Sequence, residues 1–201
     1  MENQGLPRAL VMGIAGLIFI VLFGSSMFYT INPGEKAVKF KKFGGGLDKE
    51  TIYGQGFRII APWDDLIVYD VKVQETFEKM EVLSSNGLSI KIDMSFRYNP
   101  VPDKIGYLHD EIGTNYLERI IKPEIRSVTR EVIGKYIPEE LYSSKREAIE
   151  DEIDSLTRAS IQTKYLSLDA ILIRDVTLPQ TLRTAIEQKL RQEQESLEYE
   201  F

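Results

Sequence analysis

The sequence predicts an α+β protein that begins with a membrane-spanning helix. Three observations indicate this: a charge-free apolar run near the start, strands of alternating polarity between residues 37 and 98, and apolar residues at helical spacing from residue 103 onward. With 43% hydrophobic and 28% charged residues, the chain has the composition of a folded protein. Strand character returns once, at residues 165–176, before a final charged helix.

The N-terminal apolar run extends from Ala9 to Phe28 without a charged residue. About 20 helical residues at about 1.5 Å each span about 30 Å, the thickness of a bilayer's hydrocarbon core. We therefore expect one transmembrane helix within residues 1–30. The expected anchor residues are Ala9, Leu10, Val11, Ile14, Leu17, Ile18, Phe19, Ile20, Val21, Leu22, Phe23 and Phe28.

Two features leave a cleaved secretory signal as an alternative to the anchor. Arg8 precedes the apolar run, and Gly24-Ser25-Ser26 is a small-residue stretch that could serve as a cleavage site. The anchor is favoured because the run is longer than a typical signal core. The side of the membrane that carries the large domain stays open, since flanking charges lose their orienting force before a long folded domain.

Composition excludes several classes of function. The chain has no cysteine and one histidine, so it offers neither disulfides nor a thiolate metal site. Basic and acidic residues balance over residues 1–100, and the whole net charge of −6 therefore arises in residues 101–201. This acidic second half argues against nucleic acid as a partner, because phosphate binding needs a basic surface.

The strand-rich stretch begins after a turn at residues 32–34, Asn-Pro-Gly. Residues 37–43 alternate so that Val38 and Phe40 face inward, and three glycines close this strand. The glycines predict a hairpin turn rather than a phosphate loop, because no Gly-Lys-Ser/Thr follows them. A further strand at residues 66–73 has four residues on one face: Ile67, Tyr69, Val71 and Val73.

A hairpin is the strongest local prediction. Residues 76–83 lead into Ser84-Ser85-Asn86-Gly87, in which Asn-Gly accepts the backbone angles of a tight turn. The return strand alternates over eleven residues. Its expected inward residues are Leu88, Ile90, Ile92, Met94, Phe96 and Tyr98, and its expected outward residues are Ser89, Lys91, Asp93, Ser95 and Arg97.

Helical patterns follow the proline break at residues 100–102. A short helix is expected at residues 103–109, and a second pattern from residue 114 is interrupted by Pro123, where a kink or a fresh helix start is expected. Pro138 begins a short helical turn. Ser144-x-x-Glu147 is a capping box that starts another helix. That helix is expected to bury Ile149, Ile153 and Leu156.

The last helix opens at Pro179 and has no stop signal before Phe201. It is rich in charged and amide residues, as a truncated coiled-coil helix would be, and we expect the natural protein to continue. The residues expected to make helix or oligomer contacts are Leu182, Ile186, Leu190 and Leu197.

No catalytic set emerges from the sequence. His109 lies near the end of a short helix, where a capping or surface role is the ordinary interpretation. Ser144 and Lys145 are adjacent, so on a helix they point in different directions and do not form a dyad. No cofactor or metal motif is present. We expect a protein that is not an enzyme.

Several short motifs, in order, resemble the prohibitins, within the stomatin/prohibitin/flotillin superfamily that carries the SPFH or Band 7 domain. The matching pieces are Pro33-Gly34-Glu35-x-Ala37-Val38, Gly54-x-Gly56-Phe57, Pro62-Trp63, Tyr69-Asp70-Val71, Arg97-Tyr98, Pro123-x-Ile125-Arg126 and Arg146-Glu147. The resemblance covers residues 31–201, and Pro62-Trp63 favours the prohibitin branch.

The resemblance implies a membrane-proximal β-rich SPFH subdomain at residues 31–100, a helix-rich α/β subdomain at 101–178 and the start of a coiled coil at 179–201. It also implies a membrane scaffold that forms a large homo- or hetero-oligomeric ring or cage, organises lipids and membrane proteins, and regulates an FtsH-type membrane AAA protease. Tyr29, Phe57 and Trp63 are candidate lipid contacts, with a core position equally open for Trp63. The alternative is a stand-alone lipid or small-ligand binding module that uses the apolar face of residues 88–98.

Overall fold

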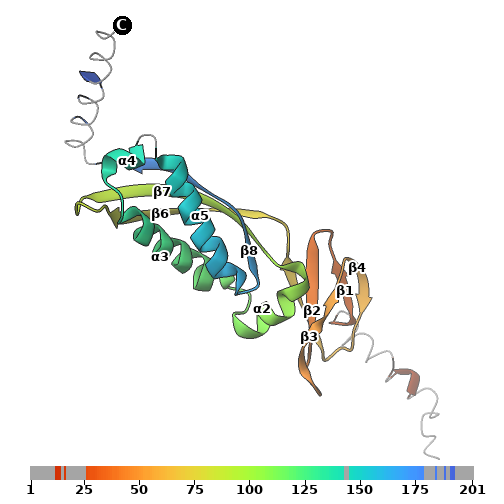
Figure 1. The fold of residues 1–201 in the computed structure, drawn as a ribbon. Helices are drawn as coiled ribbons and strands as arrows, with labels where there is room; N and C mark the ends of the chain where they lie inside the picture. The colour runs from red at the N-terminus through yellow and green to blue at the C-terminus, as the bar shows by residue number, and fades with distance from the viewer. Residues whose placement is uncertain are drawn as a thin grey trace, which may run out of the picture. The chain divides into compact units, whose positions relative to one another are not determined.

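The computed structural model describes residues 12–14, 16, 26–142, 145–178, 184, 188, 191 and 192 (Figure 1). Most of the expected anchor, the expected capping residue Ser144, and the expected coiled-coil positions Leu182, Ile186, Leu190 and Leu197 lie outside these residues. Across the described part of the chain, no helix has the length and apolar character needed to cross a membrane. The chain forms two compact units, Met1–Lys72 with Pro100–Glu111, and Val73–Asn99 with Ile112–Phe201.

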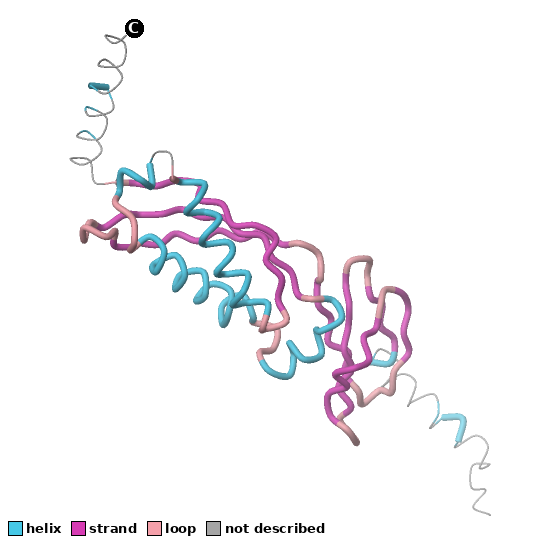
Figure 2. The backbone as a smooth tube through the Cα atoms, viewed as in Figure 1, coloured by secondary structure: helices cyan, strands magenta, loops and turns pink. Residues whose placement is uncertain are grey.

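The first unit is built from two small antiparallel sheets (Figure 2). One pairs β1 (Phe28–Ile31) with β4 (Gly56–Ile59). The other places β2 (Glu35–Lys41) between β3 (Gly46–Tyr53) and β5 (Asp65–Asp70). Its core contains Ile31, Ala37, Ile60 and Leu66, with Tyr29 and Tyr53 packed against it.

The burial of β2 departs from the predicted alternation. Ala37 and Val38 are both buried, and Phe40, expected inward, is 38% exposed instead. The register with β3 shifts between Val38 and Lys39, where residues 49–51 of β3 have no partner in β2, whereas the register with β5 stays regular. The irregularity therefore belongs to β3, and β2 itself contains no extra residue.

The burial of β5 also departs from the single face predicted for residues 66–73. Tyr69 is buried as expected, but Leu66 is buried as well and Ile67 is only half-buried. The strand ends at Asp70, and Val73, beyond it, is exposed.

A short helical segment completes the first unit. A 3₁₀ turn at Pro102–Lys104 runs into α2 (Ile105–Glu111), close to the expected helix at residues 103–109. Ile105 and Leu108 are fully buried. Gly106 lies against the backbone of Lys49 in β3, where an added Cβ would be 2.3 Å from the carbonyl oxygen.

The second unit contains a three-stranded sheet with helices on one face (Figure 1). The strands are β6 (Gln74–Leu83), β7 (Ser89–Pro100) and β8 (Leu166–Thr177), in the order β6-β7-β8. The expected hairpin is confirmed, with β6 and β7 antiparallel and Gly87 at φ 78° in the turn. The inward residues from Ile90 to Tyr98 are buried, whereas Leu88 is half-buried.

One outward residue of β7 departs from the prediction. Ser95 is only 4% exposed, although it lies on the face opposite the helices. Two long side chains on that face, those of Phe77 and Arg174, meet beside Ser95 and shield it from water.

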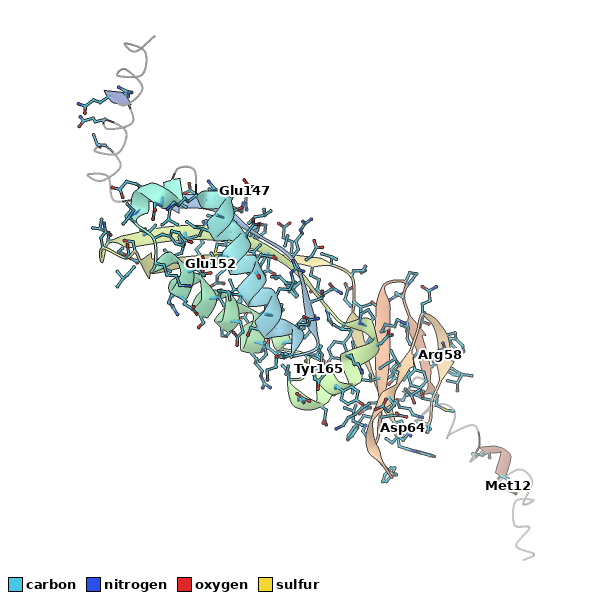
Figure 3. All side chains as sticks on the ribbon, in the orientation of Figure 1. Met12, Arg58, Asp64, Glu147, Glu152 and Tyr165 are labelled. Atoms are coloured by element: carbon cyan, nitrogen blue, oxygen red, sulfur yellow. The ribbon has the colours of Figure 1, made fainter. Side chains whose placement is uncertain are left out.

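The helices of the second unit are α3 (Lys122–Ile133), α4 (Pro138–Tyr142) and α5 (Arg146–Gln162). A π-helical turn at Leu117–Ile121 precedes α3, and Pro123 lies in the first turn of α3, so the expected fresh start is confirmed. α3 packs on β6 and α5 packs on β8, and the two helices contact each other. Glu152 of α5 strengthens this contact by accepting hydrogen bonds from Lys135 and Tyr136, each 2.9 Å long (Figure 3).

The buried stripe of α5 differs in one position from the expectation. Ile149 and Ile153 are buried, but Leu156 is 39% exposed and Thr157 is fully buried in its place. The stripe therefore follows steps of four residues along the helix, which is the ridge that packs against a neighbouring element.

The two units do not follow the single expected boundary near residue 100. The hairpin β6-β7 groups with the later helices, while residues 100–111 group with the N-terminal strands. The chain thus crosses between the units three times rather than once.

Candidate functional site

An exposed aromatic surface on the β1–β4 pair is the first candidate site. Phe28 lies opposite Ile59, and Phe57 is two residues before Ile59 on the same face. The rings of Phe28 and Phe57 stack with their centroids 5.7 Å apart. All three side chains are more than half exposed. Exposed apolar groups gathered in this way mark a contact with a membrane or a partner.

A second aromatic pair lies on turns of the same unit. Phe43 follows β2, and Trp63 lies between β4 and β5, with their ring centroids 6.3 Å apart in an edge-to-face arrangement. Trp63 is 48% exposed, which excludes the core position that the sequence left open. Phe43 was not singled out from the sequence. Its place beside a glycine-rich turn is the signal that could have found it.

The three expected lipid contacts therefore separate in the structure. Phe57 and Trp63 are exposed, but Tyr29 alternates with Phe28 along β1 and packs against the core cluster. Of the expected anchor residues, Ile14 and Phe28 are both exposed, but Phe28 begins strand β1, so its predicted place in the anchor helix is wrong. Phe28 makes the aromatic surface continuous in sequence with the apolar run.

Three lysines of β2 and its following turn are paired with carboxylates. Lys39 lies 3.9 Å from Asp64, Lys41 lies 3.2 Å from Asp48, and Lys42 lies 2.9 Å from Asp65. The backbone N–H of Thr51 and the ammonium of Lys41 lower the pKa of Asp48. Figure 3 labels Asp64 and Arg58 on this unit. These pairings offset three of the positive charges that follow the apolar run in the sequence.

His109 links α2 to β5. Its Nδ1 lies 2.7 Å from the hydroxyl oxygen of Tyr69, and the two rings meet edge to face. Partial burial lowers the pKa of His109, and the nearby charge of Asp110 opposes this shift. The arrangement favours a neutral imidazole that shares a hydrogen bond with the Tyr69 hydroxyl, which is a structural role.

The apolar face proposed as a pocket wall is filled by the protein itself. Ile90, Ile92, Met94, Phe96 and Tyr98 are each at most 2% exposed. The alternative of a ligand pocket on this face is therefore not what the structure shows. A shallow hollow of about 440 Å³ lies instead on the opposite, open face of the sheet. It is lined by Lys79, Met80, Glu81, Lys91, Ile92, Asp93, Asp175 and Thr177.

The described residues include no cluster of three or more metal-ligating side chains. The surfaces described above carry aromatic groups on the first unit and mixed charges on the open face of the sheet of the second.

Comparisons with known proteins identify the family. Residues 29–201 match the SPFH domain / Band 7 family. Prohibitin-7, mitochondrial, of Arabidopsis thaliana is 26% identical over 99% of this chain and 70% of its own length. Prohibitin 1 of Drosophila melanogaster is 26% identical over 94% of this chain and 68% of its own. Mitochondrial prohibitin complex protein 1 of Caenorhabditis elegans is 24% identical over 84% of this chain and 60% of its own.

This chain spans 60% to 70% of the length of these three relatives. The match nevertheless covers both compact units, and it confirms the resemblance carried by the short motifs. The chain belongs to the SPFH domain / Band 7 family and is similar to the prohibitins within it.

Proposed function

We propose that this protein is a single-pass, membrane-anchored scaffold whose copies associate into a large ring or cage. The observation that carries the proposal is the exposed aromatic surface of Phe28, Phe57 and Ile59, which continues the charge-free run of residues 9–28. An apolar anchor followed directly by exposed aromatic side chains is the arrangement that a membrane interface favours.

Anchoring also explains how weak contacts suffice for assembly. Copies held in one plane have a high effective concentration, so modest lateral contacts can join many of them. The C-terminal segment from Pro179 is the proposed coiled-coil contribution, through Leu182, Ile186, Leu190 and Leu197. The prohibitin relatives support self-association or association with a related chain, since one is named as a complex protein.

The proposed clients are membrane lipids and proteins, including an FtsH-type membrane AAA protease. This part of the proposal rests on family resemblance. Its test is co-extraction: the protease should accompany the scaffold in mild detergent and should separate from a variant that lacks residues 179–201. A protease that never co-purifies would remove this partner and leave the scaffold proposal intact.

The lipid contact has a direct test because Trp63 is the single tryptophan of the chain. The full chain is placed in bilayers of brominated phospholipid, and Trp63 fluorescence is compared with that in ordinary phospholipid. Strong quenching is expected if Trp63 lies at the interface. In a Trp63→Phe background, Phe57→Trp tests the β1–β4 surface, and Val68→Trp, an exposed position on β5, is the matched control.

The proposed contact is supported if brominated lipid quenches tryptophan fluorescence more strongly at positions 57 and 63 than at position 68. Equal quenching at all three positions would contradict it. Assembly is tested separately by the particle mass of the full chain in mild detergent, where a monomer would overturn the ring.

A further inference from the structure

The two outer edges of the sheet β6-β7-β8 differ. Along β8, side chains of α5 form hydrogen bonds with backbone groups of the strand. Arg158 donates to the carbonyl oxygens of Leu168 and Asp169, and Arg146 donates to those of Ile173 and Arg174. Glu150 accepts from the N–H of Ile173 at 3.1 Å. This edge is thereby protected against pairing with another strand.

Along β6, no such protection exists among the described residues. The N–H of Ser84 donates to the carbonyl oxygen of Leu88, so even-numbered residues of β6 exchange hydrogen bonds with β7. The backbone groups of Phe77, Lys79 and Glu81 therefore point away from the sheet. Within the described ranges, no other strand pairs with β6 and no side chain donates to or accepts from these groups. An open edge of this kind is a template for strand addition.

The side chains along that edge are complementary to themselves. Phe77 and Leu83 are 51% and 62% exposed, and the oppositely charged Lys79 and Glu81 lie between them. We propose that two copies of this chain pair antiparallel along β6, about a two-fold axis at Met80. In this register, Lys79 lies opposite Glu81 of the second copy, and Phe77 lies opposite its Leu83, each twice.

Other registers are less favourable. If one copy is shifted by two residues along the other in one direction, Lys79 lies opposite Lys79 of the second copy. The same shift in the other direction places Glu81 opposite Glu81. A parallel, in-register pairing places every charge against its like. Like charges directly opposite one another destabilise a strand pair, whereas opposite charges and apolar pairs each stabilise it. The pattern Phe-Lys-Glu-Leu at alternate positions therefore selects one register.

The contact deepens the proposed self-association and rests on it. It joins two three-stranded sheets into one continuous sheet. Because it is a two-fold contact, growth beyond two copies needs a second surface, such as the coiled coil. The pairing ends at Leu83, where Gly134 at the end of α3 lies beside the strand's carbonyl oxygen.

The register is tested by disulfide trapping of the full chain in mild detergent. The chain has no cysteine, so Lys79→Cys chains can be mixed with differently tagged Glu81→Cys chains. Residues opposite each other in a hydrogen-bonded antiparallel pair have Cα atoms about 5.5 Å apart, within disulfide range. The mixture should form linked pairs about tenfold faster than either variant alone. Lys91→Cys mixed with Asp93→Cys on the central strand β7 is the matched control.

A charge exchange tests the same register without cysteines. Lys79→Glu and Glu81→Lys should each weaken the dimer by about tenfold, because two attractive pairs become repulsive. Mixing the two variants should restore wild-type affinity, since each charge then meets its opposite. Lys79 also lies 3.1 Å from Asp93 in its own chain. Lys79→Glu removes this ion pair in the monomer and in the dimer alike, so its loss does not account for a change in dimer affinity.

The outcomes separate the two proposals. Fast trapping with restoration in the mixture supports the β6 contact. If the protein forms a large particle but the cysteine variants form disulfides no faster than the control, the β6 contact is overturned and the scaffold proposal stands. Trapped dimers that grow no further support the contact and overturn the ring. A monomer that is never trapped overturns both.

Discussion

Arg174 of β8 lies over the ring of Phe77 of β6, with its guanidinium carbon 4.9 Å from the ring centroid, although β7 runs between the two strands. Ser95 of β7 is paired in register with Phe77 and lies beneath this contact. The small serine lets the two long side chains meet across it, and they in turn remove it from water. This explains why an outward-facing polar residue is buried.

We predict that Ser95→Leu destabilises the second unit by about 1–3 kcal/mol, because the larger side chain forces Arg174 and Phe77 apart. Chemical denaturation followed by far-UV circular dichroism measures the change. Lys91→Leu, at an exposed outward position of the same strand, is the control and should change stability by under about 0.5 kcal/mol. Equal effects of the two substitutions would contradict the covering role of Arg174.

Gly106→Ala should destabilise the first unit by about 3 kcal/mol or more, since backbone atoms of Lys49 occupy the space that a Cβ needs. Trp63 fluorescence during denaturation reports this unit selectively. Gly54→Ala is a matched control, because nothing lies within 4 Å of a Cβ at that position. A stability of Gly106→Ala close to that of Gly54→Ala would show that α2 does not pack closely on β3.

Arg126 of α3 pairs with Glu78 of β6, with Nε 2.7 Å from the carboxylate. Arg126→Met should cost about 1–3 kcal/mol of stability, because the buried carboxylate of Glu78 loses its cation. The partial exposure of Arg126 keeps the cost below that of a fully buried pair. The double variant with Glu78→Leu should recover much of the loss. Lys122→Met removes a pair whose carboxylate, that of Glu118, is far more exposed than that of Glu78, and it should cost under about 1 kcal/mol.

The contact between His109 and Tyr69 should make the first unit sensitive to acid. Burial lowers the pKa of His109 in the folded state, whereas an unfolded histidine titrates near 6.5. As the pH falls below about 6.5, the unfolded chain binds a proton first, and the free energy of unfolding declines until the pH passes below the folded-state pKa. Trp63 fluorescence should show wild type losing more stability than His109→Phe between about pH 7.5 and about pH 5. The same loss in both proteins would contradict this prediction.

The hairpin, the helix start at Pro123 and the return to strand near residue 166 could be predicted from the sequence. Each depends on neighbours within a few residues: alternation along a strand, Asn-Gly in a tight turn, or a proline in the first turn of a helix. The family could also be predicted, because short motifs keep their order along the chain. These signals are local, and distant contacts did not alter them.

The candidate site could be predicted only in part. Phe57 and Trp63 could be singled out because they are aromatic residues that follow the predicted anchor in the sequence. Nothing in the sequence shows that β1 turns Tyr29 toward the core and Phe28 outward, because the face of a four-residue strand is chosen by the sheet it joins. Phe43 enters the site only because the fold brings its turn to Trp63.

By itself, the sequence determined the strands β2 and β5 to β8, the helices between residues 102 and 162, and the family, whereas β1, β3 and β4 were not predicted from it. Tertiary structure decided what each surface meets. Phe40 is exposed although it lies two residues after the buried Val38 on the same strand, Arg174 lies over Phe77 beside Ser95, and α5 protects the edge of β8 while β6 stays open. The physical reason is that periodicity sets the direction of a side chain, whereas its burial depends on residues far along the chain that only folding brings close.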